Sequence, residues 1–430
     1  MLMRILMFGW EFPPHISGGL GTACYGLTKG LSSFNDIDLI FVVPKVYGDE
    51  HKPDMKLIGA SDVELTRKTV RMQKEFEEKM FFEFREHVSA YITPEQFEQI
   101  SVERQERLKN EDSNTPTNKL TFTGNYGTSL FDEISRYAVV ASNIARNEPH
   151  DVIHAHDWLT YPAGIEAKKV SGKPLVIHVH ATEYDRSGEN INQRVYEIER
   201  RGMEVADKVI TVSNLTRNIV IQKYGIHPSK IVTIHNAVED ANNYEIKQLS
   251  RGKTNRKIVT FLGRITMQKG PEYFIEAANM VLKKKSDVNF IMAGSGDLMI
   301  KMVKMAAMLR ISKNFHFTGF LKGDDVFSMF RMSDLYVMPS VSEPFGISPL
   351  EAMQSHVPVI ISKQSGVSEV IRHAIKINFW DIDAMADAIY GVLSYDALAS
   401  HLRRNGKQEV DNLKWVDAAA KIKEVYYQVA

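Results

Sequence analysis

Short apolar runs with the length of buried strands alternate with helical stretches along almost the whole of this 430-residue chain. Such alternation is typical of α/β proteins, in which helices cover the faces of a parallel sheet. The length exceeds what one ordinary core supports, so we expect two doubly wound, Rossmann-like domains facing across a cleft. The predicted strands fall near 4–8, 37–43, 151–155, 175–179, 208–212, 231–234, 258–262, 288–293, 315–318, 335–338, 357–361 and 375–378.

A polar segment without clear periodicity, 236–257, separates the two series of strands and is interpreted as a linker. We therefore place the N-terminal domain at 1–240 and the C-terminal domain at 257–410. Apolar residues at steps of four over 72–88 predict an amphipathic helical insertion within about 52–120. Packing on the first domain is favoured over a partner-binding coiled coil, and such an insertion could act as a lid.

Composition excludes several classes of function. The formal net charge is zero, from 53 basic and 53 acidic residues, which argues against a general affinity for nucleic acid. The single cysteine, Cys24, cannot form an intrachain disulfide, and the N-terminus lacks a signal-peptide pattern. No run reaches the roughly 18 apolar residues of a transmembrane segment. We expect a cytoplasmic protein, and nothing in the sequence indicates its oligomeric state.

A helix start is marked after the predicted strand 335–338. Ser348, Pro349 and Glu351 together form the signature of a capping box, with Ser348 as N-cap and Pro349 at the first helical position. We therefore predict that a helix begins here. Glu351 could be only the capping partner of Ser348, or it could also face a ligand.

The loop before this helix carries the clearest chemical signal. Glu343 has no capping role, and it follows a strand at the edge where open parallel sheets bind their ligands. The loop also directs backbone N–H groups toward the positive end of the helix, where an anionic or polar ligand is favoured. These N–H groups belong to Phe345, Gly346 and Ile347.

Two cations lie just beyond the first strand of the second domain. Arg264 and Lys269 follow the predicted strand 258–262 and could together neutralise a diphosphate. Arginine offers a bidentate fork and lysine a movable point charge. Alone, the pair could be two exposed loop cations; together with Glu343 it favours a binding site.

Glycines follow several predicted strands, where they either form tight turns or let the backbone approach a ligand closely. The paired glycines after the first strand open a helix, and two later turns could line the pocket of a nucleotide base. No dinucleotide-binding fingerprint is present. The residues concerned are Gly18, Gly19, Gly294, Gly319, Phe320 and Leu321.

Two His-x-His pairs end neighbouring strands of the first domain. Strand alternation sends His154 and His156 to the same face, so a metal site must be considered. The second pair is His178 and His180. We expect His154 and His178 to be satisfied interior residues. The outer residues, including Asp157, would border the cleft and contact sugar hydroxyls, because no further histidine-rich segment completes a metal site. We therefore predict no bound metal.

Together these residues resemble the retaining GT-B glycosyltransferases, which include glycogen and starch synthases and sucrose-phosphate-synthase-like enzymes. The pattern Glu-x7-Glu from Glu343 to Glu351, with Gly-Arg and Lys-Gly around Arg264 and Lys269, stands in the order of that group. The His-Ala-His-Asp-Trp run that ends at Trp158 resembles the α-glucan synthases in particular. The resemblance covers nearly the whole chain outside 52–120.

The resemblance implies roles for the donor side of the cleft. Arg264 and Lys269 would hold the donor diphosphate, and Glu343 would meet the hydroxyls of the donor sugar. The N–H groups of 345–347 would fix the sugar further, and Glu351 would bind the ribose. The only co-substrate implied is a nucleoside diphosphate sugar, with ADP, UDP and GDP all open; no separate cofactor is implied.

The resemblance also implies that His180 contacts the sugar at the reaction centre and that Asp157 lies toward a carbohydrate acceptor. A helix near 415–430 would pack back on the first domain. The reaction would transfer a hexose, glucose in the first instance, with retention of configuration. Ile16 and Phe345 depart from the glucan-synthase pattern, which weakens the case for polymer synthesis more than for glycosyl transfer.

Other functions remain open at this point. The acceptor could be an α-glucan, as in glycogen synthase, or a different carbohydrate. A different class of enzyme would be a metal-dependent hydrolase built on the His-x-His pairs. A third alternative is a non-catalytic protein that binds sugar nucleotides.

Overall fold

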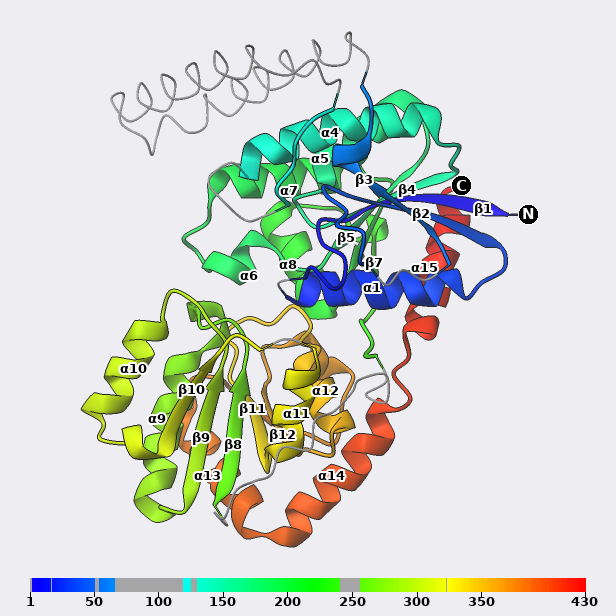
Figure 1. The fold of residues 1–430 in the computed structure, drawn as a ribbon. Coiled ribbons are helices and arrows are strands. Elements are labelled where there is room, and N and C mark those ends of the chain that lie inside the picture. The colour runs from blue at the N-terminus through cyan, green and yellow to red at the C-terminus, as the bar shows by residue number, and fades with distance from the viewer. Residues whose placement is uncertain are drawn as a thin grey trace, which may run out of the picture.

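The structure is a computed structural model that consists of two lobes (Figure 1). The predicted helical stripe at 72–88, most of the predicted insertion and most of the predicted linker lie outside the residues that it describes. Those residues are 2–16, 18–50, 54–65, 119–124, 130–239, 256–321 and 323–430.

The described part of the N-terminal lobe holds a 7-stranded parallel sheet in the order β3-β2-β1-β4-β5-β6-β7. The chain starts in the middle of the sheet and reverses its direction of winding between β1 and β4. That switch point is where such sheets open a crevice for a ligand. The strands are β1 (Met3–Phe8), β2 (Ile37–Val43), β3 (Lys56–Gly59), β4 (Val152–His156), β5 (Leu175–Val179), β6 (Lys208–Thr211) and β7 (Ile231–Thr233).

Helices cover both faces of this sheet, each over its own apolar core. One face packs against α4, α5, α7 and α8, and the other packs against α1 and the last helix of the chain. The helical elements are α1 (Gly19–Ser32), α4 (Leu130–Asn147), α5 (Tyr161–Ser171), α6 (Glu183–Ser187), α7 (Gln193–Val205) and α8 (Asn214–Tyr224), with 3₁₀ turns η1 (Ala60–Asp62) and η2 (Pro228–Lys230).

The described part of the C-terminal lobe repeats the plan with a 6-stranded parallel sheet in the order β10-β9-β8-β11-β12-β13. Its switch point lies between β8 and β11. The strands are β8 (Lys257–Leu262), β9 (Val288–Ala293), β10 (Phe315–Gly319), β11 (Leu335–Met338), β12 (Val359–Ser362) and β13 (Ile375–Ile377).

Two further apolar cores lie on the two faces of the second sheet. None of the described helices is both long and apolar enough to cross a membrane. The helical elements are η4 (Met267–Lys269), α9 (Pro271–Lys284), α10 (Met299–Met308), η5 (Ser312–Asn314), α11 (Asp324–Met332), α12 (Ser348–Gln354), η6 (Gly366–Glu369), α13 (Ile382–Ser394), α14 (Asp396–Val410) and α15 (Trp415–Val429).

The last helix returns to the first lobe. Figure 1 shows α15, in red, beside α1 and β1. Trp415 of α15 lies against Gly26 of α1, where an added Cβ would come within 2.2 Å of the indole ring. Tyr426, farther along α15, is fully buried under the same sheet. Small residues on α1 therefore allow the two helices to approach closely.

The predicted fold class, two Rossmann-like domains, is confirmed. One strand was not predicted: β3, Lys56–Gly59, extends the edge of the first sheet beside β2. It is short and only partly buried, so it lacks the long apolar run that marks the inner strands. Edge strands are often of this kind, and their pairing depends on the neighbouring strand.

Candidate active site

The two lobes meet at the loop that follows β11. Ser342 Oγ in this loop donates a hydrogen bond of 2.6 Å to Asp185 Oδ1 of α6 in the first lobe. Close by, the backbone of Gly366 approaches Ser213, and an added Cβ would lie 2.5 Å from the Ser213 Cβ. The loop that carries Glu343 therefore faces the N-terminal lobe.

Glu343 and Lys269 form an ion pair at this junction. Lys269 Nζ lies 2.5 Å from Glu343 Oε2, and the two side chains are 20% and 9% exposed. Ser340 Oγ donates a further hydrogen bond of 3.2 Å to the same carboxylate. The structure thus brings together two residues predicted from separate motifs, at the carboxyl ends of the adjacent strands β8 and β11.

Arg264 lies on the same edge but does not reach Glu343. It is exposed, and its guanidinium donates to Gln268 Oε1 at 2.9 Å. Gln268 is buried, and its amide nitrogen donates to the Ser342 carbonyl at 3.1 Å. Gln268 therefore connects the cationic loop after β8 to the loop of Glu343, a role that the sequence did not predict.

The loop after Glu343 presents backbone N–H groups. Among the described residues, the amide nitrogens of Phe345, Gly346 and Ile347 donate to no acceptor. Gly346 has a positive φ of 95°, which few other residues adopt easily, and Phe345 is buried beneath the loop. These N–H groups have no acceptor among the described residues, and their predicted contact with a ligand stays a prediction.

The predicted capping box is wrong. Helix α12 begins at Ser348 with Ile347 as N-cap, and no side chain caps it. Ser348 Oγ instead lies 2.8 Å from the Tyr336 hydroxyl, so Glu351 has no capping partner to serve. Glu351 lies in the first turn of α12, and partial desolvation of its carboxyl group raises its pKa to about 7.

Glycine backbone forms the neighbouring edge of the sheet. Gly294 donates to the Gly319 carbonyl at 2.8 Å, and an added Cβ on Gly294 would lie 1.8 Å from the Gly263 oxygen. The ends of β8, β9 and β10 thus pack backbone to backbone. Phe320 is 49% exposed beside them and Leu321 is partly buried.

The paired glycines of the first lobe stand at the N-terminus of α1. Gly18 is the N-cap and Gly19 the first helical residue. Both are exposed, and an added Cβ on either would meet nothing within 4 Å. The open space at this helix end is compatible with the predicted contact to a donor.

On the side of the first lobe, Asp157 holds the loop of His180. Asp157 Oδ1 accepts hydrogen bonds from the backbone N–H groups of His180 (2.8 Å) and Ala181 (3.2 Å). It is buried with a positive φ of 59°, and burial raises its pKa to about 6 although Arg186 opposes the shift. Asp157 therefore positions the loop of His180, and its predicted place toward an acceptor stays a prediction.

His180 is neutral in this setting. It is partly exposed, and its Nε2 lies 2.9 Å from His156 Nδ1. Burial lowers the pKa of His180 to about 3, so the ring can donate or accept a hydrogen bond but carries no charge near pH 7.

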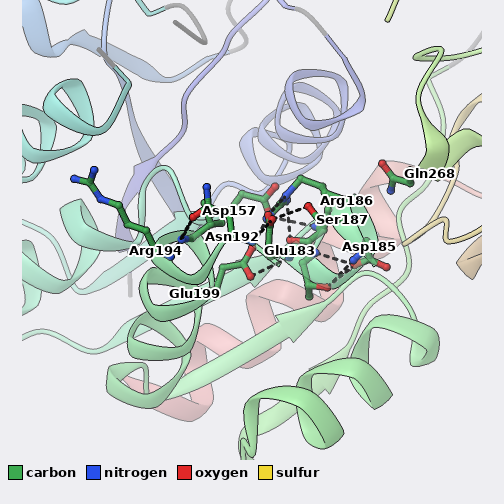
Figure 2. A network of polar contacts seen from close by, with 12 residues as sticks. Asp157, Glu183, Asp185, Arg186, Ser187, Asn192, Arg194, Glu199 and Gln268 are labelled. Atoms are coloured by element: carbon green, nitrogen blue, oxygen red, sulfur yellow. Dashed lines mark hydrogen bonds and ion pairs between the residues drawn. The ribbon is translucent and has the colours of Figure 1, made fainter. Parts of the chain in front are cut away.

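A buried polar network continues from Asp157 through α6 and α7 (Figure 2). Arg186 pairs with Glu183 at 3.2 Å and with Glu199, which also accepts from the Tyr224 hydroxyl. Burial raises the pKa of Glu199 to about 7 despite the adjacent guanidinium. This network fixes α6, which carries Asp185 to the opposite lobe.

The inner histidines only partly match the prediction. His154 and His178 are buried, and His154 Nδ1 lies 2.6 Å from the Tyr426 hydroxyl. Neither ring nitrogen of His178 has a hydrogen-bond partner among the described residues. The expectation that His178 is a satisfied interior histidine is therefore wrong, because its neighbours across the sheet face are other imidazoles.

Several site residues were missed by the sequence analysis. Thr182 and Asp185 form a capping box on α6, and their Thr-x-x-Asp spacing is a signal that could have been recognised. No such signal marks Gln268, Ser342 and Glu369. The residues with which they form hydrogen bonds lie far away along the chain.

Comparison with known proteins places the chain in a family. Residues 119–242 match the family described as Glycosyltransferase Family 4, and residues 243–409 match Glycosyl transferases group 1. The chain is 24% identical over 434 residues to a glycogen synthase of Mycobacterium tuberculosis, which covers 99% of this chain and 94% of that protein.

Solved structures share the fold. Sucrose-phosphate synthase of Thermosynechococcus elongatus superimposes with a TM-score of 0.71 at 18% identity, over 99% of this chain and 98% of that one. Anabaena HepE in complex with UDP-glucose gives a TM-score of 0.67 at 17% identity, over 99% and 100%. At such identities the likeness shows the fold alone. With both family matches, it identifies the chain as a glycosyltransferase of the GT-B fold, composed of a family 4 and a group 1 domain.

Proposed function

We propose that this glycosyltransferase moves a hexose, glucose in the first instance, from a nucleoside diphosphate sugar to a carbohydrate acceptor with retention of configuration. The observation that carries the proposal is the Lys269–Glu343 pair, set beside unoccupied N–H donors on a loop that touches the opposite lobe. A cation, a carboxylate and N–H dipoles then converge where a diphosphate and a sugar would meet.

The donor side follows from this placement. Lys269 and Arg264 would neutralise the diphosphate, and Glu343 would accept hydrogen bonds from the sugar hydroxyls. The N–H groups of 345–347 would hold the sugar, and Glu351 would bind the ribose. The glycine edge at Gly294 and Gly319 would admit the base. HepE was solved with UDP-glucose, which supports a nucleotide sugar of this kind here.

The chemistry suits these groups. Cleavage of a glycosyl–phosphate bond builds negative charge on the diphosphate and positive charge on the sugar. Fixed cations and N–H dipoles stabilise the departing charge most where water is excluded. The acceptor hydroxyl would attack from the face that the diphosphate leaves, with the departing phosphate taking its proton, so configuration is retained. Neutral His180 would hydrogen-bond the sugar at the reaction centre.

An α-glucan is the first acceptor to test, because glycogen synthase aligns along nearly the whole chain. The outer end of β4, with Asp157 behind it, would border the acceptor. A carbohydrate other than a glucan is the alternative, since the departures at Ile16 and Phe345 affect the glucan-synthase pattern more than glycosyl transfer.

A donor and acceptor screen tests the proposal. ADP-, UDP- and GDP-glucose are each incubated with and without malto-oligosaccharides, and nucleotide release and product configuration are measured by chromatography and NMR. We expect one donor to be turned over and the new linkage to be α. An inverted product would refute retention. Failure of malto-oligosaccharides as acceptors would remove the glucan-synthase version, and no turnover of any nucleotide sugar would refute the function.

A further inference from the structure

Four imidazoles form one cluster on a single face of the first sheet. His154 and His156 point the same way from β4, and His178 and His180 do so from β5, where His156 is paired with His178 in the register. The ring centroids of His154, His156 and His178 are separated by 4.3, 5.2 and 5.4 Å. The exposed fractions of these three residues do not exceed 2%. Helices α1 and α15 cover this face.

The inner three rings have nitrogen atoms without partners. His154 Nε2, His156 Nε2 and both nitrogens of His178 are buried and make no hydrogen bond with any described residue. A buried polar atom left unsatisfied destabilises the fold, so such atoms normally have a protein or solvent partner. Three neighbouring rings with free nitrogens indicate that something else binds here.

The other nitrogens of two rings are already held. His154 Nδ1 lies 2.6 Å from the hydroxyl of Tyr426, and His156 Nδ1 lies 2.9 Å from His180 Nε2. Metal-binding histidines characteristically use one ring nitrogen for the ion and the other for such an outer contact, which orients the ring. Both contacts leave Nε2 as the free atom.

The spacing also fits an ion. One ligand atom from each of His154, His156 and His178 lies within 4.8 Å of the other two. Nitrogens that share one tetrahedral zinc ion at about 2.0–2.1 Å are roughly 3.4 Å apart. His178 stacks on His154 at 4° and on His156 at 29°, so the rings must turn for their nitrogens to converge on one ion.

We propose that His154, His156 and His178 bind a single transition-metal ion, with Zn²⁺ as the best match. Three imidazoles suit zinc, copper or nickel, whereas calcium and magnesium require oxygen ligands. The ion would join β4 to β5 and, through Tyr426, to α15. The ion would lie behind His180 and would take no part in glycosyl transfer. This proposal replaces the earlier expectation that these histidines hold no metal.

The test measures metal binding by the full chain. The protein is freed of metal with a chelator under mild denaturant, refolded, and titrated with Zn²⁺ and with Co²⁺, whose absorption spectrum reports nitrogen coordination. We expect one ion per chain, a tetrahedral cobalt spectrum and a higher unfolding temperature with zinc. His178→Gln should abolish this binding. His15→Gln is the control, since His15 belongs to a separate exposed group with Asp49 and Glu50.

Two further variants keep the test decisive if His178→Gln fails to fold. Tyr426→Phe removes only the outer hydroxyl and should weaken zinc affinity by about 10–100-fold. Cys24→Ala should leave the affinity unchanged; Cys24 belongs to an overlapping group with His156 and His180. Loss of binding in Cys24→Ala would overturn the assignment to the three histidines. Zinc affinity that is absent, or that is lost only in His15→Gln, would overturn the site altogether.

Discussion

At the scale of single residues, the protonation of Glu351 should control donor binding. Its raised pKa of about 7 means that the carboxylate is mostly ionised at pH 8 and mostly protonated at pH 6. If the ionised form accepts hydrogen bonds from the ribose, the KM for the nucleotide sugar should rise about tenfold as the pH falls from 8 to 6. Steady-state kinetics across this range checks the prediction.

The matched control is Glu351→Gln, which should show a raised KM with no step near pH 7. A step of equal size in this variant would assign the titration to another group.

The raised pKa of Glu351 also affects the pH dependence of stability. Because folded Glu351 binds its proton more tightly than the unfolded chain does, its contribution to stability should decline as the pH rises from about 4.5 to 7.

Asp157 offers a second prediction at this scale. Asp157→Ala leaves the partly buried N–H groups of His180 and Ala181 without their acceptor, at a cost of about 1–3 kcal/mol. We expect kcat/KM to fall by about 10–100-fold because the loop of His180 loses its position. Asp157→Asn keeps an acceptor oxygen and should restore most of the rate. Equal losses in the two variants would show that the charge, not the hydrogen bonding, matters.

The location of single site residues was predictable where they directly follow a buried strand. Glu343 and Lys269 each follow a buried strand, so their motifs could be placed on one edge of the second sheet. Gln268 and Ser342 were not predictable, because their hydrogen bonds connect loops 74 and 157 residues apart. The prediction of a capping box was wrong for a related reason. The Ser348 hydroxyl contacts the hydroxyl of Tyr336, a tertiary partner that the local sequence does not reveal.

At the scale of elements, the contact between α1 and α15 should be sensitive to one methyl group. Gly26→Ala would place a Cβ within 2.2 Å of the Trp415 ring, which is itself buried. We expect the free energy of unfolding to fall by about 1–3 kcal/mol, as in other overpacked interiors. Denaturant unfolding measures this change.

Gly391→Ala is the control for helix propensity. Gly391 lies inside α13, and an added Cβ there would have its nearest neighbour 4.0 Å away. Alanine is favoured over glycine in a helix by roughly 1 kcal/mol, so this variant should be neutral or more stable. If both substitutions changed stability alike, close packing of α15 on α1 would not be the cause.

Elements of the interior were predictable to within a few residues, because continuous apolar runs mark buried parallel strands. The pairing order of the strands was not predicted, since it depends on contacts that local patterns do not encode. The histidine cluster shows the same limit. Alternation predicted that His154 and His156 share a face, but only the register of β4 with β5 places His178 beside them.

At the scale of the whole molecule, Glu369 should hold the lobes together. Its carboxylate, in the second lobe, accepts from the backbone N–H groups of Asn214 and Leu215 at the start of α8, and it lies 2.7 Å from His235 Nε2. Glu369→Ala should let the lobes separate, which small-angle X-ray scattering would record as a larger radius of gyration.

Glu409→Ala provides a matched control, because Glu409 also accepts from two backbone N–H groups and a histidine, but entirely within the second lobe. It should leave the radius of gyration unchanged. If the Glu369 variant scattered like the wild type, the interlobe contact would not determine the arrangement of the lobes.

The account as a whole depends on a diphosphate held at Arg264 and Lys269. The most direct measurement is kcat/KM for the preferred nucleotide sugar in Arg264→Ala and Lys269→Ala, with exposed Lys304→Ala as control and thermal unfolding to confirm folding. We predict a loss of about 10²–10³-fold in each of the first two variants, roughly 3–4 kcal/mol of transition-state stabilisation, and no change in the third. Turnover near the wild-type rate in folded Arg264→Ala and Lys269→Ala would contradict the account.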